Sequence, residues 1–212
     1  MKADAEILER LYTAESPQEI AEIYSQWAKT YDEGLNEGSG YVAPQWCLKL
    51  LEKYVPSKDV RLLDAGAGTG LFGQLLQQRG YQSVVGIDIS EGMLEEARKK
   101  NAYTELHQKI LGEPLGFPSD CFDATISVGV FSPAQGPSSA FDELIRITKP
   151  GGYIMFTLRH EFYEDSKFGF KPKQLELEAA GKWTLEEKTE KFQGLPKGDP
   201  DLFYNVWVYK VN

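Results

Sequence analysis

The sequence has few of the residues on which disulfide scaffolds, metal centres and membrane anchors depend. Its 212 residues include only two cysteines and two histidines. Cys47 and Cys121 stand in unrelated contexts, and His107 and His160 are too few for a histidine-based metal site. No apolar run approaches the length of a membrane span, and residues 1–12 lack the apolar core of a signal peptide. We therefore expect a metal-free cytoplasmic protein without a membrane partner.

Positive charge is also scarce. The chain has 23 lysines and arginines against 32 acidic residues, which gives a formal net charge of −9. Proteins that bind duplex DNA or structured RNA usually present a basic face, so this balance argues against a nucleic-acid partner. Hydrophobic residues make up 42% of the chain, an ordinary share for a globular protein of this length. We expect one compact unit that exists as a monomer or a homodimer.

The most informative segment runs from Val60 to Gly70, where an apolar stretch ends at an acid and glycine then alternates with small residues. Residues 60–63 predict a short buried strand, and Asp64 stands at its carboxyl end. The glycines at 66, 68 and 70 allow a tight turn and a close approach of the backbone to a ligand. Residues 71–79 predict a helix whose free N–H groups and dipole face the same place. The segment is typical of a loop that holds a nucleotide.

Two classes of nucleotide-binding protein fit this loop. Residues 68–73 match the G-x-G-x-x-G pattern of dinucleotide-binding folds, which is a weak signal by itself. Asp64 argues against a pyrophosphate, since a second negative charge would gain nothing there, and suits a ligand with an ammonium or a sulfonium. Asp88 ends the next apolar strand, residues 83–87, where an acid accepts hydrogen bonds from both ribose hydroxyls in either class. It excludes a 2′-phosphate and leaves both classes open.

The other segments predict an α/β fold. Two helices are expected before residue 56, and the capping box Ser16–Glu19 begins the first of them. Strands and helices then alternate, which indicates a parallel sheet. Residues 183–192 and 202–211 alternate in polarity and should form an antiparallel hairpin at the sheet edge. We predict a Rossmann-like sheet of seven strands, mostly parallel with an antiparallel last strand, and helices on both faces.

Several segments resemble the motifs of class I S-adenosylmethionine-dependent methyltransferases. DAGAGTG is similar to the first motif and GIDIS, followed by Met93, to the second. FPSDCFDATISVGVF and ELIRITKPGG resemble the segments that enter the fourth strand and precede the fifth. YSQWAKTYD, GYVAP, VGVFS, FTLR and VWVYKV resemble the Williams–Beuren-region methyltransferase-like subgroup. The resemblance covers nearly the whole chain from Tyr24 and implies S-adenosylmethionine as the cofactor, while the closing hairpin is unusual for a dehydrogenase domain.

The resemblance also implies which residues hold the methionine end of the cofactor. Asp64, Gly66 and Gly68 would contact the methionine and ribose part. Ser127 and Val128, at the tip of the fourth strand, would lie beneath the sulfonium.

For the ribose and the adenine, the resemblance implies a second set of residues. Asp88 would accept hydrogen bonds from the ribose hydroxyls, and Ile89 and Met93 would pack on the adenine. Many relatives have an acid just after the third strand that accepts the adenine amino group, but Ile110 stands at this place here. We therefore expect apolar contact and the backbone N–H of Leu111 to hold the adenine.

In the resembling proteins, the N-terminal segment forms a lid on the cofactor site. This implies a helical lid of residues 1–56 on a methyltransferase domain of residues 57–212. Tyr24, Tyr31 and Tyr41 are candidates to touch the cofactor or the substrate, since a lid excludes water and offers aromatic contacts to a sulfonium. Alternatively these aromatic residues form the core between helix and sheet, which we expect for Trp27.

Methyl transfer from a sulfonium is an in-line displacement, so alignment of the reactants is the main task and a base is needed only for a protonated acceptor. Arg159 and His160 follow the fifth strand, at the edge of the sheet where ligands bind. His160 is a candidate base, Arg159 could bind a carboxylate of the acceptor, and Tyr31 is the third catalytic candidate. Alternatively, residues 159–161 form a surface loop with solvated charges.

Three functions remain open. The leading one is methyl transfer from S-adenosylmethionine to an O, N or other nucleophile of a small molecule. The sequence has no Pro-Cys pair for cytosine methylation and no Asn/Asp-Pro-Pro-aromatic motif for amino groups of adenine or glutamine. A small-molecule acceptor, or a protein side chain of another type, is what remains. The alternatives are a catalytically silent cofactor-binding protein that acts through partners, and an NAD-dependent oxidoreductase.

Overall fold

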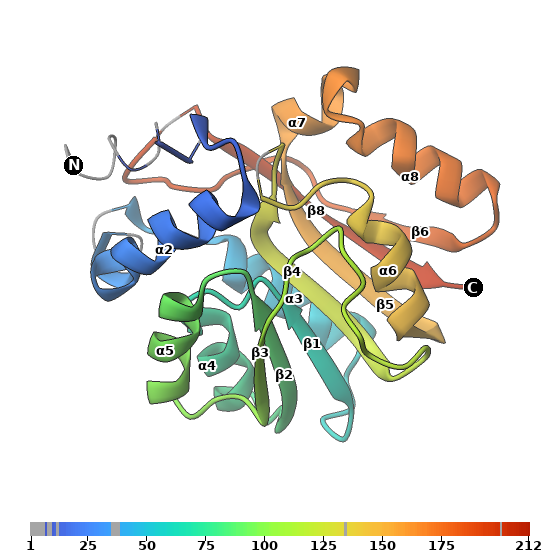
Figure 1. The fold of residues 1–212 in the computed structure, drawn as a ribbon. Helices are drawn as coiled ribbons and strands as arrows, with labels where there is room; N and C mark the ends of the chain where they lie inside the picture. Colours follow the sequence, from blue (N-terminus) through green and yellow to red (C-terminus); the bar gives the residue numbers. More distant parts are fainter. Residues whose placement is uncertain (1–6, 8–9, 12, 35–38, 134, 200) are drawn as a thin grey trace.

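In the computed structural model the chain forms one mixed β-sheet with helices on both faces (Figure 1). The structure describes residues 7, 10–11, 13–34, 39–133, 135–199 and 201–212. The strand order is β3-β2-β1-β4-β5-β8-β6, and the short β7 pairs with β8. The strands are β1 (Arg61–Ala65), β2 (Ser83–Asp88), β3 (Glu105–Gln108), β4 (Phe122–Phe131), β5 (Thr148–Arg159), β6 (Trp183–Lys188), β7 (Phe192–Gln193) and β8 (Phe203–Val211). The predicted Rossmann-like class is confirmed.

The five strands from β3 to β5 run parallel, and β8 runs antiparallel to both β5 and β6. The predicted antiparallel pairing of the last two segments at the sheet edge is confirmed, with β6 at the edge, but the first arm ends at Lys188 instead of residue 192. The arm breaks because the side-chain hydroxyl of Thr189 accepts the hydrogen bond of the Val206 N–H at 3.0 Å. The chain then pairs again with β8 as β7.

Two apolar clusters cover the two faces of the sheet. On one face, α3 (Ala43–Tyr54) and α4 (Leu71–Gln78) pack on the strands through residues such as Leu51 and Phe72. On the other face lie α6 (Ala140–Ile147) and α8 (Phe170–Ala179). The remaining elements are α5 (Glu91–Lys99), α7 (His160–Glu164) and the 3-10 helix η2 (Ser166–Phe168). No helix in the described segments is long and apolar enough to cross a membrane.

The first described helix, α2 (Pro17–Asp32), lies apart from the sheet and over α5 (Figure 1). Ser16 caps it by accepting the Glu19 N–H at 3.2 Å, as the capping box predicts, and the Glu19 carboxylate in turn accepts the Glu15 N–H. Trp27 is buried as expected, but in a cluster of the N-terminal segment with Ile20 and Ile23. In contrast, α3 belongs to the core of the sheet, and the domain boundary at residue 56 stays a prediction.

Helix α2 packs on the first turn of α5. A Cβ atom on Gly92 would lie 2.7 Å from the Cα of Ser25, so only glycine allows this approach of the two helices. The Ser25 and Ser90 hydroxyls are 2.8 Å apart, and the Gly92 N–H donates to the Ser25 hydroxyl at 3.3 Å. Close backbone packing and three polar groups therefore fix α2 on α5.

We expect Gly92→Val to separate α2 from α5 without unfolding the sheet, because the added side chain meets the backbone of Ser25. Amide hydrogen exchange in residues 17–32 should become at least about tenfold faster, while exchange in β1 and β4 stays unchanged. Glu95→Val places the same side chain on the exposed face of α5 and is the matched control. Equal exchange in the two variants would contradict this role of Gly92.

Candidate functional site

The loop after β1 runs close against β2 and β4. Gly66, Gly68 and Gly70 have φ angles of +97°, +53° and +88°, in the region that favours glycine. A Cβ on Gly66 would lie 2.1 Å from the Cγ2 of Val130, so this position also excludes a larger residue on steric grounds. Nothing lies within 4 Å of the Cβ position of Gly68. The loop therefore packs tightly on β4 at Gly66 and is open to a ligand at Gly68.

Asp88, at the end of β2, faces this loop. Its Oδ2 accepts the Gly68 N–H at 2.8 Å, and its Oδ1 accepts the Ser90 N–H at 2.9 Å. The side chain is half-buried, and burial raises the pKa of the Asp88 carboxyl, although the backbone N–H groups act in the opposite direction. The two carboxylate oxygens have about four acceptor positions together, and the backbone N–H groups of Gly68, Ser90 and Ile89 leave at least one of them for a ligand.

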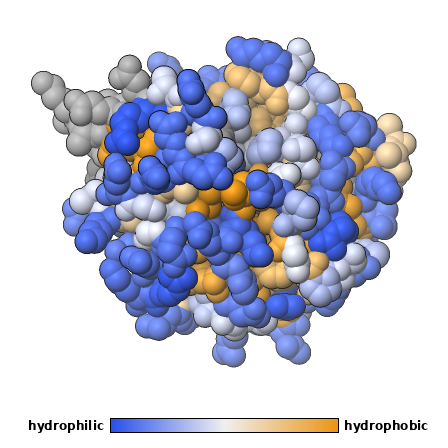
Figure 2. Space-filling view, in the orientation of Figure 1, coloured by the Kyte–Doolittle hydropathy of each residue, from blue (hydrophilic) through white to orange (hydrophobic). Residues whose placement is uncertain are grey.

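A pocket opens at the carboxyl ends of β1, β2 and β4. It is a partly open hollow whose lining combines apolar side chains, backbone and a few polar groups, as is typical of small-molecule sites. Apolar surface is exposed near the middle of this face of the molecule (Figure 2). The residues predicted to hold the cofactor that line the pocket are Gly66, Gly68, Asp88, Ile89, Met93, Leu111, Tyr24 and Tyr31, and Val128 joins them.

Two residues predicted to contact the cofactor lie behind the pocket wall. Asp64 is 1% exposed, and its Oδ2 accepts the Tyr103 hydroxyl at 2.7 Å. Its Oδ1 is buried and has no hydrogen-bond partner among the described residues. Ser127 is equally buried and donates its hydroxyl to the Ala65 carbonyl oxygen at 2.7 Å. Neither lines the pocket, and their contact with the cofactor stays a prediction.

Residues of the N-terminal segment cover one side of the pocket. Tyr24 and Tyr31 both line it, with their rings edge-to-face at 6.2 Å, and Gln135 donates to the Tyr24 hydroxyl at 2.6 Å. Tyr41 lies over the tip of β4, since a Cβ on Gly129 would come within 2.3 Å of its hydroxyl. Burial, followed by the charge of Asp88, raises the pKa of Tyr31. Its phenol therefore stays protonated and can donate a hydrogen bond, but is a poor base.

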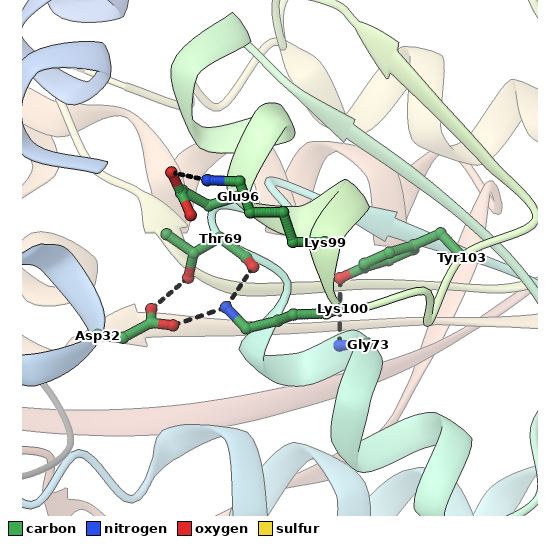
Figure 3. Close-up of polar contacts among 7 residues, drawn as sticks. All are labelled: Asp32, Thr69, Gly73, Glu96, Lys99, Lys100 and Tyr103. Atoms are coloured by element: carbon green, nitrogen blue, oxygen red, sulfur yellow. Dashed lines mark hydrogen bonds and ion pairs between the residues drawn. The ribbon is translucent and has the colours of Figure 1, made fainter. Parts of the chain in front are cut away.

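A polar network fastens the end of α2 to the glycine loop (Figure 3). The Thr69 hydroxyl donates to the Oδ1 of Asp32, and the Nζ of Lys100 lies 2.6 Å from both the Asp32 Oδ2 and the Thr69 carbonyl oxygen. Thr69 is 2% exposed, so the contact is shielded from water. The sequence analysis missed these three residues. The only signal for them was the acid that ends the YSQWAKTYD segment, and it does not indicate its partners.

The two other catalytic candidates lie away from the pocket lining. Arg159 ends β5, forms an ion pair with Glu161 and lies over the Phe162 ring at 4.8 Å. His160 begins helix α7, where a surface loop was the expected alternative, and its Nδ1 is 3.0 Å from the Asn205 Oδ1. Neither is among the described residues that line the pocket, and their catalytic roles stay predictions.

Five lining residues were not predicted as site residues from the sequence: Ile87, Lys109, Gly129, Val130 and Gln135. Lys109 follows β3, and Gly129 and Val130 continue β4 beyond the predicted end of that strand at residue 128. Because ligands bind at the carboxyl ends of parallel strands, the position of these three residues at predicted strand ends could have identified them. No such signal existed for Gln135, which reaches the pocket from the loop before α6. Within the described residues, no group of three or more histidine, cysteine, aspartate or glutamate side chains could hold a metal ion.

The residues present fit S-adenosylmethionine better than a dinucleotide. A buried carboxylate oxygen without a partner, at Asp64, suits a cationic group and would repel a pyrophosphate. The open face of Gly68 and the free acceptor positions of Asp88 suit the backbone and the ribose of a nucleoside.

Comparison with known proteins agrees with this fit. Residues 63–156 match a family model described as a methyltransferase domain. The chain is 35% identical over 160 residues to methyltransferase-like protein 27 of Homo sapiens, in a match that covers 73% of this chain and 64% of that protein. It is 32% identical over 148 residues to a demethylmenaquinone methyltransferase of Clavibacter sepedonicus, covering 67% and 58%. The chain thus spans less than two thirds of the length of either relative.

A solved structure has the same fold. The S-adenosylmethionine-dependent methyltransferase from Mesorhizobium loti matches with a TM-score of 0.61 and 19% identity, and the match covers 79% of this chain and 98% of that chain. The human relative fits the subgroup that the sequence resembles. Residues 63–156 therefore belong to the methyltransferase-domain family, and the chain has the fold of the S-adenosylmethionine-dependent methyltransferases.

Proposed function

We propose that this protein transfers the methyl group of S-adenosylmethionine, by direct in-line displacement, to an oxygen, nitrogen or other nucleophile of a small molecule. The observation that carries the proposal is the lidded pocket in which the glycine loop, Asp88 and the tip of β4 come together. The pocket is concave, and its lining combines apolar side chains with a few polar groups, which supports a small acceptor. The net charge of −9 argues against a nucleic-acid acceptor.

Within the pocket we assign each wall to a part of the cofactor. The turn at Gly66 and Gly68 would hold the methionine part, because both glycines line the pocket and the backbone at Gly68 is open to a ligand. Asp88 would accept the ribose hydroxyls with the lone pairs that its backbone N–H partners leave free. Ile89 and Met93 would pack on the adenine, and the backbone of Leu111 lies close enough to the same wall to contribute.

The bound cofactor supplies a methyl group that its sulfonium already activates. The side chains of this protein then have to align the acceptor and exclude water. Tyr24 and Gln135 close one side of the pocket through their hydrogen bond, and Tyr31 offers a phenol donor. The described lining contains no histidine or cysteine. This favours an acceptor that reaches the pocket with a free lone pair or an ionised nucleophile, since no imidazole is present to take its proton.

The second candidate is a cofactor-binding protein that has no transfer activity and acts through partners. It is favoured by the position of Arg159 and His160, which do not line the described pocket. The two candidates share the cofactor and differ only in turnover.

We expect the protein to label a small molecule when it is incubated with S-adenosylmethionine that carries a deuterated methyl group and with a fractionated metabolite panel. Mass spectrometry should detect a product that has gained one labelled methyl group, and the Asp88→Ala variant should form less of it when the cofactor is below saturation. Cofactor binding without a labelled product in any fraction, including peptide fractions, would favour the silent binding protein.

We expect Asp88→Ala to weaken binding of S-adenosylhomocysteine at least about tenfold, because hydrogen bonds to a charged acceptor are worth more than one kcal/mol. Isothermal titration calorimetry measures the change. Glu105→Ala removes an exposed acid from the neighbouring strand β3 and serves as the control, with unchanged affinity. An unchanged affinity in Asp88→Ala would contradict the ribose placement.

Gly66→Ala and Gly68→Ala should separate the two properties of the loop. The methyl group at residue 66 meets Val130, so we expect a lower melting temperature together with a loss of cofactor binding. The methyl group at residue 68 meets no protein atom and enters the pocket. We therefore expect Gly68→Ala to weaken cofactor binding while lowering the melting temperature less than Gly66→Ala does. Thermal unfolding with and without S-adenosylhomocysteine measures both effects, and equal behaviour of the two variants would contradict the geometry.

A further inference from the structure

The aromatic ring of Tyr103 lies in a slot formed by glycines. Cβ atoms on Gly73, Gly86 and Gly70 would lie 2.3, 3.0 and 3.2 Å from atoms of this ring. Gly73 is the third glycine of the apparent G-x-G-x-x-G pattern. Its missing side chain makes room for a tyrosine and not for a phosphate, which accounts for the pattern without a dinucleotide. Tyr103 stands between α5 and β3, and the slot carries its hydroxyl under the glycine loop.

The Tyr103 hydroxyl joins the loop to the helix that follows it. It accepts the Gly73 N–H, in the first turn of α4, at 3.1 Å (Figure 3), and donates to the Oδ2 of Asp64 at 2.7 Å. Burial and the charge of Asp64 raise the pKa of Tyr103, so the phenol keeps its proton and remains a donor. The N–H at a helix start polarises the hydroxyl that it contacts and strengthens the hydrogen bond to the carboxylate.

Asp64 has little else to stabilise its charge. The titratable groups that act on it are Tyr103, the like-charged Asp88 and the buried thiol of Cys47, and the described residues place no cation against it. Burial raises the pKa of Asp64 to about 7, with Asp88 adding to the rise and the Tyr103 hydrogen bond opposing it. The Oδ1 of Asp64 is left as a buried acceptor without a protein donor.

We propose that Tyr103 is a positioning residue of the cofactor site: its hydroxyl orients Asp64 behind the pocket wall, so that the charge on the unpartnered Oδ1 attracts the ammonium group of the methionine part. The proposal rests on the proposed placement of that part at the glycine loop. A neutral Asp64 would lose most of its attraction for an ammonium. Affinity for a ligand with this group should therefore rise as the pH increases through about 7, where Asp64 loses its proton.

The test compares the wild-type protein with Tyr103→Phe, which keeps the ring in its slot and removes only the hydroxyl. Carbon-13 NMR follows the ionisation of Asp64 in the cofactor-free protein, and calorimetry follows the affinity for S-adenosylhomocysteine between about pH 5 and about pH 9. In Tyr103→Phe both midpoints should rise by about one pH unit, the effect of one hydrogen bond to a carboxylate. The affinity near pH 7 should fall several-fold and recover in part at higher pH.

Two controls separate this role from a merely structural one. Tyr81→Phe removes another buried hydroxyl, which donates to the Val55 carbonyl oxygen at 2.8 Å, and should leave both midpoints unchanged. 5′-Methylthioadenosine lacks the amino-acid end of the cofactor, so its affinity should be insensitive to pH in this range and to Tyr103→Phe. In an Asp64→Asn background, Tyr103→Phe should have no further effect on the pH dependence.

The outcomes distinguish the proposal from the function on which it rests. An unchanged NMR midpoint of Asp64 in Tyr103→Phe would overturn the role of Tyr103 even if S-adenosylhomocysteine binds well. A shifted NMR midpoint with an affinity that does not follow it would overturn the attraction between Asp64 and the ammonium. Failure of the wild-type protein to bind S-adenosylhomocysteine at any pH would instead contradict the cofactor assignment itself.

Discussion

A carboxylate buried at the end of β1 is the feature on which the rest of the site depends. Asp64 is 1% exposed and has a single side-chain hydrogen bond, from the Tyr103 hydroxyl. Placing a charge in such surroundings is costly unless a cation arrives to accompany it. The glycine turn, the tyrosine under it and the pocket above it form one arrangement around this acid. The arrangement selects a positively charged nucleotide cofactor over a pyrophosphate.

The lid depends on the same loop. α2 contributes little to the core of the sheet, and three contacts along its length hold it over the pocket. Ser25 meets the first turn of α5, Tyr24 accepts a hydrogen bond from Gln135, and Asp32 binds the loop through Thr69 and Lys100. Because Thr69 stands between Gly68 and Gly70, the end of α2 is bound to the same loop that we propose holds the methionine part. A displacement of α2 should therefore also displace the glycine loop, and the reverse.

Much of this fold could be predicted from the sequence, because hydrophobic periodicity and glycine punctuation are local signals. The acids at the ends of β1 and β2 and the helix after the glycine loop were predicted in this way and lie where expected. The insertion of β8 between β5 and β6 was not predicted, since two alternating segments do not show which of them lies next to β5. The hydroxyl of Thr189, which ends β6 early, gives no signal in the sequence.

In the site, too, the residues with a local sequence signal were predicted and those that depend on tertiary contacts were not. Gly66, Gly68 and Asp88 could be predicted because each belongs to a motif with fixed spacing. The partners Asp32, Lys100 and Gln135 could not, because their contacts join segments far apart in the chain and depend on tertiary packing alone. Tyr103 belongs to no motif, and its hydrogen bond with Asp64 depends on the three glycines around its ring, which come together only in the fold.

Isothermal titration calorimetry of the wild-type protein with S-adenosylhomocysteine and with NAD, under the same conditions, tests the central claim most directly. The account predicts saturable one-to-one binding of S-adenosylhomocysteine and no detectable heat from NAD. Binding of NAD without binding of S-adenosylhomocysteine would contradict it.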